Sequence, residues 1–147
     1  MSDFKSNHPY IARMVVAGEL EVSQDRYKEA EAYFSKDFKF YGPGGITLDS
    51  NGLANYFVSL RHAFPDLTIR REVAFGEGVY LAARTVFNGT FTNTFTQSPV
   101  GPLEPHGKTI EWEVMNIFRF DDEGLIAEDY VQTDGNAFLE KLQPSNP

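Results

Sequence analysis

Asp129 and Asn116 are the two residues of this chain whose type and spacing best suit proton-transfer chemistry. Residues 125–132 alternate between two sets, and Asp129 falls in the set that is otherwise apolar. Residues 109–120 alternate in the same way, and Asn116 is the polar member of their apolar set. Because alternate residues of a strand share a face, both side chains are predicted to point into an apolar interior.

The chemistry expected of this pair follows from these surroundings. A turn at residues 121–124 makes the two segments neighbouring antiparallel strands, so Asn116 and Asp129 are expected to meet in one cavity. Burial raises the pKa of a carboxylate, and a carboxylate that titrates near neutral pH can act as general base or acid. An adjacent amide can orient it or stabilise an enolate. Two alternatives stay open, in which Asp129 is solvated or is paired with a buried donor such as Arg84.

The remaining candidates are residues expected to line the same pocket and bind substrate. The 13 phenylalanines and 7 tyrosines suit a deep core or pocket in a small domain. The predicted lining residues are Phe40, Tyr41, Tyr56, Phe57, Phe87, Trp112, Val114 and Met115. Trp112 can equally be plain core, and for Tyr41 and Tyr56 a place in the core or at the rim is the favoured alternative.

Other kinds of site find little support in the sequence. The three histidines are far apart and none has the spacing of a metal-ligand pair, and the chain has no cysteine. No serine stands in a nucleophile elbow, and no glycine-rich segment precedes a helix as a phosphate loop does. We therefore expect neither a metal ion nor a cofactor.

Charge and hydropathy limit the partners and the location. The net charge of −8 argues against nucleic acid and anionic membranes. No apolar run approaches the ~18 residues of a membrane span, and residues 1–10 do not resemble a signal peptide. A cytoplasmic protein with a single domain over residues 1–147 is expected.

The pattern of hydrophobic residues predicts helices first and strands afterwards. Short helical segments are expected at residues 9–17, where Gly18 interrupts, and at 23–34. A clearer helix follows at 49–64, with Asp49 or Ser50 as its N-cap and Pro65 as its stop.

After Pro65 the period changes from 3.6 to 2. In the first strand Leu67, Ile69, Val73 and Phe75 are expected to share a face. Later strands are expected at 79–96, 109–120 and 125–132, and a closing helix at 134–142. This order predicts an α+β fold in which a curved antiparallel sheet wraps around helices and encloses an apolar pocket.

Several short motifs resemble those of the SnoaL-like polyketide cyclases. The segment Ala63-Phe64-Pro65-Asp66-Leu67 resembles the A-F-P-D-L that joins helix to sheet in that family. Residues 87–91 and 105–108 match next, and residues 118–128 resemble the family's R-F-x-D-G-K-I-x-E-x-W strand pair. The motifs follow one another in the family's order, and the resemblance covers about residues 25–142.

The resemblance implies the cone-shaped fold of the nuclear transport factor 2 superfamily and a homodimer formed through the sheet. We expect Tyr80, Arg84, Glu111, Glu113 and Ile117 at or near that interface.

The resemblance also implies chemistry. Family members close a ring by an intramolecular aldol reaction without a cofactor, using an aspartate on the last strand. The position where the family commonly has an acid is Val131 here, and Asp129, two residues earlier on the same face, would take that role. Two family histidines correspond to Asn116 or Met115 and to Phe40 or Tyr41.

Three functions therefore remain in view. The first is a cyclase or isomerase that moves a proton next to a carbonyl group of an apolar, polyketide-like substrate, with Asp129 as acid/base. The second is a non-catalytic binder of an apolar small molecule, because a fold does not fix a function. The third is a dimeric interaction domain.

Overall fold

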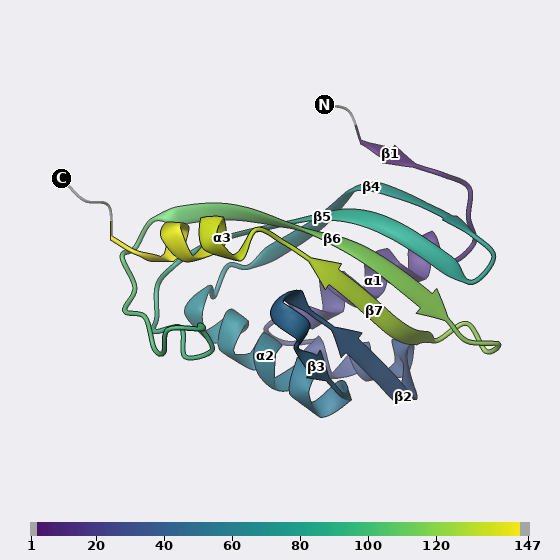
Figure 1. Cartoon of the computed structure of the whole chain (residues 1–147), viewed down its shortest axis with the longest axis horizontal. Helices are drawn as coiled ribbons and strands as arrows, with labels where there is room; N and C mark the ends of the chain where they lie inside the picture. The colour runs from purple at the N-terminus through teal and green to yellow at the C-terminus, as the bar shows by residue number, and fades with distance from the viewer. Residues whose placement is uncertain (1–2, 145–147) are drawn as a thin grey trace.

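The computed structural model describes residues 3–144, which form a single seven-stranded curved sheet with helices packed along its inner side (Figure 1). The elements are β1 (Phe4–Lys5), α1 (Ile11–Glu21), η1 (Tyr27–Tyr33), β2 (Phe34–Tyr41), η2 (Pro43–Gly45), β3 (Thr47–Leu48), α2 (Ser50–Ala63), β4 (Thr68–Glu77), β5 (Tyr80–Thr90), β6 (Thr109–Phe120), β7 (Ile126–Gln132) and α3 (Gly135–Leu142). The strand order is β1-β4-β5-β6-β7-β2-β3.

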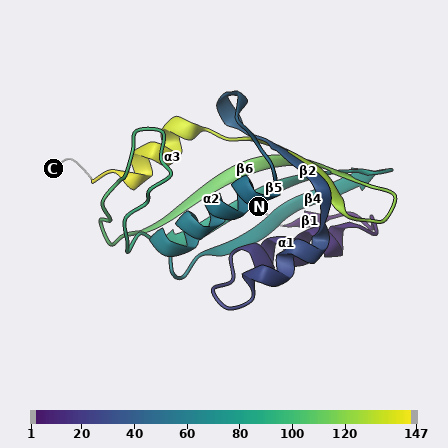
Figure 2. The same cartoon turned by 90° about the horizontal axis from the view of Figure 1, so that it is seen from below.

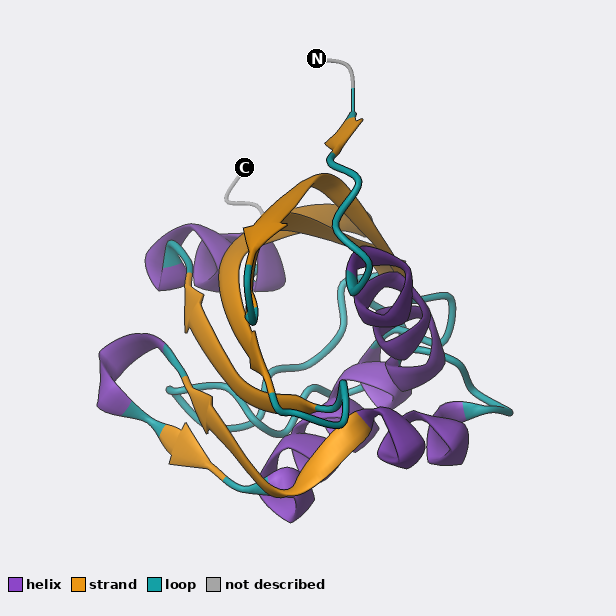
Figure 3. Ribbon diagram, turned by 90° about the vertical axis from the view of Figure 1, so that its right-hand side faces the viewer, coloured by secondary structure: helices purple, strands orange, loops and turns teal. Residues whose placement is uncertain are grey.

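The sheet has the predicted antiparallel meander at its centre. Strands β4 to β7 pair antiparallel in sequence order. Outside this meander, β2 pairs parallel with β7 and β1 pairs parallel with β4, while the edge strand β3 pairs antiparallel with β2. Seen end-on, the strands curl through a wide arc (Figure 3). Both α1 and α2 cross the same face of the long strands (Figure 2).

The first helix is longer than its sequence pattern predicted. It continues through Gly18, which is buried, to Glu21. A side chain at position 18 would place its Cβ 2.7 Å from Nη2 of Arg71, so this glycine allows the helix to approach β4 closely. The segment 23–34, expected to be helical, forms only the 3-10 helix η1 before β2 begins.

The second helix matches its prediction. The side chain of Asp49 accepts a hydrogen bond of 2.9 Å from the backbone N–H of Gly52, which caps the first turn. Its apolar stripe of Leu53, Phe57 and Leu60 is buried against the sheet. The helix ends at Ala63, two residues before Pro65.

A β-bulge in β4 changes which residues face inward. Arg71 pairs with Thr85, but Val73 pairs with Arg84, so the register shifts between them. Arg71 follows Leu67 and Ile69 on the buried inner face, and the bulge after it leaves Phe75 50% exposed on the outer face. The predicted alternation of residues 67–75 was therefore wrong beyond Arg71.

The long strands β5 and β6 differ in how well they were predicted. β6 occupies residues 109–120 as expected, whereas β5 ends at Thr90 rather than near residue 96. After it the chain forms a loop closed by one bridge between Phe95 and Leu103.

Aromatic side chains fill the core between β5, β6, the C-terminal end of α2 and α3. The Trp112 ring stacks on Phe87 at 5.4 Å between centroids and also contacts Phe64 at 5.0 Å and Phe138 at 4.6 Å. Trp112 is only 7% exposed. The inward face predicted for β6 is therefore present, and this part of the interior is packed with side chains.

Candidate functional site

Asn116 and Asp129 meet on the inner face of the sheet, as predicted. Nδ2 of Asn116 donates to the Asp129 carboxylate, at 3.0 Å from Oδ1 and 3.4 Å from Oδ2. Both residues are buried. In the ladder Asp129 pairs with Phe118, two residues along β6 from Asn116, so the contact joins diagonal neighbours on one face.

The pair belongs to a longer chain of buried hydrogen bonds across four strands. Nη1 of Arg71 donates to Oγ1 of Thr85 at 2.7 Å, and that hydroxyl donates to Oδ1 of Asn116 at 2.7 Å. Since the arginine can only donate, the hydroxyl proton of Thr85 points onward, which turns the Asn116 amide nitrogen toward Asp129. The chain thus runs in one direction, from Arg71 to the Asp129 carboxylate.

The electrostatics of Asp129 suit a group that changes protonation near neutral pH. Burial raises its pKa to about 7, while the hydrogen bond from Asn116 and the charge of Arg71 act in the opposite direction. Burial also lowers the pKa of Arg71, whose guanidinium lies 5.3 Å from the ring centre of Phe118. The Nε of Arg71 is buried without a hydrogen-bond partner.

A large cavity of about 1120 Å³ lies at the end of α1 and is bounded by η1, β2, α2 and the β6–β7 turn. Phe38, Leu53 and Phe57 give it an apolar wall, and Glu21 and Arg61 are charged groups in its lining. Neither Asn116 nor Asp129 is among its lining residues.

The predicted substrate-binding residues are therefore spread over several places. Only Phe57 lines the large cavity. Phe87 and Trp112 belong to the aromatic core, and Trp112, Val114 and Met115 border a second cavity of about 380 Å³ beside α3. The pattern of strand faces correctly predicted which side chains point inward, but not which part of the interior stays unfilled.

Two of these candidates lie on the outer face of the sheet. Met115 is 52% exposed there, so it does not share the interior with Asn116. The Tyr41 ring stacks on Tyr130 at 4.8 Å, and Tyr130 is 41% exposed. Both corrections follow from the two-residue period of a strand, because each residue directly adjoins an inward-facing neighbour, Asn116 and Phe40 respectively.

Phe40 and Tyr56 are half-buried at other points of the interior. Phe40 is the ladder partner of Asp129, and its ring covers Gly42. Tyr56 packs edge-on against Phe57 and Phe95, and burial raises the pKa of its hydroxyl to about 12.

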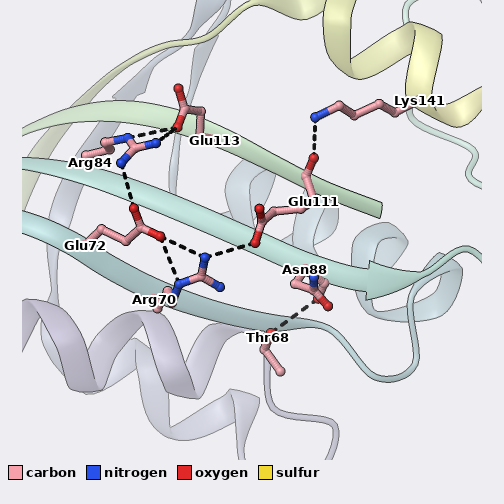
Figure 4. A network of polar contacts seen from close by, with 8 residues as sticks. All are labelled: Thr68, Arg70, Glu72, Arg84, Asn88, Glu111, Glu113 and Lys141. Carbon is pink, nitrogen blue, oxygen red and sulfur yellow. Dashed lines mark hydrogen bonds and ion pairs between the residues drawn. The ribbon is translucent and has the colours of Figure 1, made fainter. Parts of the chain in front are cut away.

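Arg84, the alternative partner considered for Asp129, lies on the outer face. Its guanidinium forms ion pairs with Glu72 at 2.7 Å and Glu113 at 2.6 Å, and Arg70 extends this network from Glu72 to Glu111 (Figure 4). Asp129 is therefore not paired with Arg84.

Sequence reasoning missed three polar residues of this region: Glu21, Arg71 and Thr85. Thr85 lies on the same face as Ala83 and Phe87, and the alternation of residues 81–87 could have placed it inside. Arg71 follows Leu67 and Ile69 at alternate positions before the bulge, so the same alternation could have placed it inside. Glu21 ends a helix whose length was underestimated.

Two kinds of feature are absent from residues 3–144. No three histidine, aspartate or glutamate side chains gather there as a metal ion would require. None of the helices in that range is both long and apolar enough to cross a membrane.

Solved structures of similar shape all show the same fold at low sequence identity. A SnoaL-like protein from Jannaschia sp. CCS1 superposes with a TM-score of 0.76 at 16% identity, covering 97% of this chain and 100% of its own. IdmH from Streptomyces antibioticus superposes with a TM-score of 0.72 at 23% identity, and the match covers 92% of this chain and 99% of IdmH. AclR from Streptomyces galilaeus superposes with a TM-score of 0.70 at 21% identity, and the match covers 88% of this chain and 80% of AclR.

Sequence comparison gives the family. No curated protein shows significant similarity to the chain. The model of the family described as SnoaL-like polyketide cyclase matches residues 14–142, from the first helix to the last, and the structural neighbours have the same α+β fold with a curved sheet. This chain belongs to the SnoaL-like polyketide cyclase family.

Proposed function

We propose that the protein is a cofactor-free cyclase or isomerase that uses Asp129 as a general acid/base on an apolar, polyketide-like carbonyl compound. The observation that supports this most is the buried Asp129 carboxyl group, held by Asn116 and with its pKa raised to about 7. A carboxyl group that titrates near working pH is well matched to taking up and returning a proton.

In the proposed reaction the Asp129 carboxylate takes a proton from a carbon next to a carbonyl group. The electron pair of the broken C–H bond moves toward the carbonyl oxygen and forms an enolate or enol. In an isomerisation Asp129 returns the proton to another carbon. In a cyclisation the enolate carbon attacks a second carbonyl group, and the oxygen of that group takes the proton that Asp129 holds. The Asn116 amide, fixed by Thr85, keeps the carboxylate in one orientation throughout.

The large cavity supplies the space for such a substrate. Its volume of about 1120 Å³ suits a molecule of several fused rings, and its apolar wall of Phe38, Leu53 and Phe57 favours a hydrophobic one. Because Asp129 does not line this cavity, the proposal requires that the bound substrate reach past Glu21 toward Asp129.

Hydrogen–deuterium exchange of a simple ketone tests the proposal without knowledge of the substrate. β-Tetralone in deuterium oxide exchanges its acidic C–H positions next to the carbonyl group, and NMR follows the loss of signal. The protein is expected to accelerate this exchange. Asp129→Asn is expected to slow it by about a hundredfold to ten-thousandfold, since that is the usual effect of removing a general base. The matched control is Asp37→Asn, a carboxylate exposed on β2 and outside the cavity.

A second candidate is a non-catalytic binder of an apolar small molecule. The absence of Asp129 and Asn116 from the cavity lining favours it. If β-tetralone binds but its exchange is not accelerated, and the Asp129→Asn variant gives the same exchange rate as the native protein, the result supports the binder and contradicts the enzyme.

We further propose that the protein forms a homodimer through the outer face of the sheet. Phe75, Tyr80, Met115, Ile117 and Tyr130 leave a broad part of this face apolar, each between 41% and 52% exposed. Contiguous exposed apolar area of this kind is typical of an interaction surface. The charged network around Arg84 lies beside it, so the expected interface has an apolar centre and a polar margin.

A further inference from the structure

Glu21 is an acidic residue of the large cavity whose carboxyl group has no hydrogen-bond partner among residues 3–144. It is the last residue of α1 and lines the cavity. Its side chain forms no hydrogen bond or ion pair with any residue between 3 and 144, whereas its backbone carbonyl accepts a hydrogen bond from Nη1 of Arg61 at 2.6 Å. The backbone at this point is thus fixed, and the Glu21 carboxyl group is free to contact a molecule bound in the cavity that this residue lines.

Charged groups from three other elements surround Glu21. Arg71 of β4 and Arg61 of α2 favour its ionised form, while Asp129 of β7 opposes it. Burial is the largest effect and raises the pKa of Glu21 to about 8. At neutral pH the carboxyl group therefore mostly keeps its proton, and it carries an O–H donor that no group of the described chain accepts.

The cavity brings this donor next to an apolar surface. Phe38, Leu53 and Phe57 form the wall, and the Arg61 guanidinium, also in the lining, lies 4.1 Å from the ring centre of Tyr27. A ligand that fits has an apolar, ring-containing body and a hydrogen-bond acceptor at one end. A ketone oxygen has this property, and an un-ionised carboxyl group is a suitable donor for it.

We propose that Glu21 holds the ligand in this cavity by donating a hydrogen bond to a ketone oxygen of an apolar, ring-containing molecule. A consequence for catalysis follows, and it rests on the proposed function. If Asp129 is the general base, Glu21 is the general acid. Asp129 takes the proton from carbon, the C–H electron pair forms the enol double bond, and the carbonyl oxygen takes the Glu21 proton. One carboxylate is consumed and one formed, so charge and protons balance.

The position of Arg71 suits a pair of carboxyl groups of which Asp129 is the base and Glu21 the acid. Its charge lowers the pKa of both Glu21 and Asp129 and so limits the effect of burial on each. Asp129 has the additional hydrogen bond from Asn116, and Glu21 does not. Asp129 is therefore the more acidic of the two, which suits a base and an acid working at one pH.

The test uses prodan, a naphthalene ketone whose emission moves to longer wavelength when its carbonyl group accepts a hydrogen bond. Bound to the native protein near pH 6.5, prodan is expected to show this emission, and its affinity should fall about tenfold as pH rises above 8 and Glu21 ionises. Glu21→Met removes the donor and should weaken binding about tenfold at every pH, with emission at shorter wavelength. Glu21→Gln keeps an N–H donor and should retain binding but lose its pH dependence.

The matched control is Glu19→Gln, the same substitution at an exposed position of the same helix and outside the cavity, which should behave as the native protein does. Equal pH dependence in native protein and Glu21→Gln, or native emission in Glu21→Met, would overturn the inference. If a variant does not fold, the inference is still tested by the pH dependence of prodan affinity in the native protein, and an affinity that does not fall above pH 8 would overturn it.

The β-tetralone exchange separates this inference from the proposed function. If the exchange depends on Asp129 but substitutions of Glu21 do not change prodan binding, the proposed function is retained and the role of Glu21 is refuted. Prodan binding that follows Glu21, together with no exchange in the native protein, would support the ligand contact and refute catalysis.

Discussion

The Arg71 guanidinium lies in the space that a side chain at position 18 would occupy, with Nη2 2.7 Å from the Cβ that an alanine there would have. Gly18 thereby allows a buried cation to sit between α1 and the sheet, where it can act on both Glu21 and Asp129. The first prediction tests this relationship.

Gly18→Ala is expected to lower the free energy of unfolding by about 1 kcal/mol. Displacement of Arg71 weakens a charged hydrogen bond to Thr85, which costs about 2 kcal/mol, while alanine gains about 1 kcal/mol of helix propensity. In an Arg71→Ala background the same change should cost less, because the contact with the guanidinium is absent and only Cδ1 of Ile69, 3.1 Å from the added Cβ, remains close. Urea denaturation of the four proteins of this cycle measures the difference. An equal cost in both backgrounds would contradict the contact.

Asp129→Asn is expected to raise the free energy of unfolding at pH 8 and to leave it nearly unchanged at pH 4. The substitution removes a buried carboxyl group that is costly to ionise, and asparagine can still hydrogen-bond to Asn116. Thermal unfolding at the two pH values provides the measurement. A large loss of stability at pH 8 would mean that the carboxylate is a structural partner of Arg71.

The stability of the native protein is expected to fall as pH rises from about 5 to 8. Burial raises the pKa of Asp129 to about 7 and that of Glu21 to about 8 in the folded state, above their ordinary values of 3.8 and 4.5. Within this range the folded state keeps protons that the unfolded state has released, so each group lowers the unfolding free energy by about 1.4 kcal/mol per pH unit. The stabilising contribution is complete below the unfolded pKa and lost above the folded one. A Glu21→Gln, Asp129→Asn double variant should show a much flatter profile.

Trp112→Ala is expected to cost about 3–5 kcal/mol of stability and to leave prodan binding in the large cavity unchanged. The ring packs against Phe64, Phe87 and Phe138 and does not line that cavity. Loss of prodan binding in a variant that remains folded at low temperature would mean that Trp112 is a ligand platform after all.

Ile117→Lys is expected to convert a homodimer into a monomer, because it places a charge at the centre of the exposed apolar face. Light scattering at micromolar concentration gives the mass. The control is Val16→Lys, which adds the same charge at an exposed apolar position of α1. A native protein that is already monomeric would remove the dimer proposal.

The sequence by itself determined the local features on which the candidate site depends. Alternation in residues 109–120 and 125–132, together with the short turn between them, placed Asn116 and Asp129 on one inner face. Asp49 and Pro65 marked the limits of α2. These inferences held because a strand's two-residue period and a helix cap are set by residues close together in the chain.

Only the tertiary structure decided where the space lies and which charges surround it. The bulge after Arg71 reversed the faces of the residues that follow it, and Gly18 made room for the Arg71 guanidinium, although neither feature has a local signal. Aromatic rings from distant elements filled the interior around Trp112 and left the cavity at the end of α1, beside Glu21. A face follows from periodicity, but an unfilled volume depends on how side chains remote in sequence pack together.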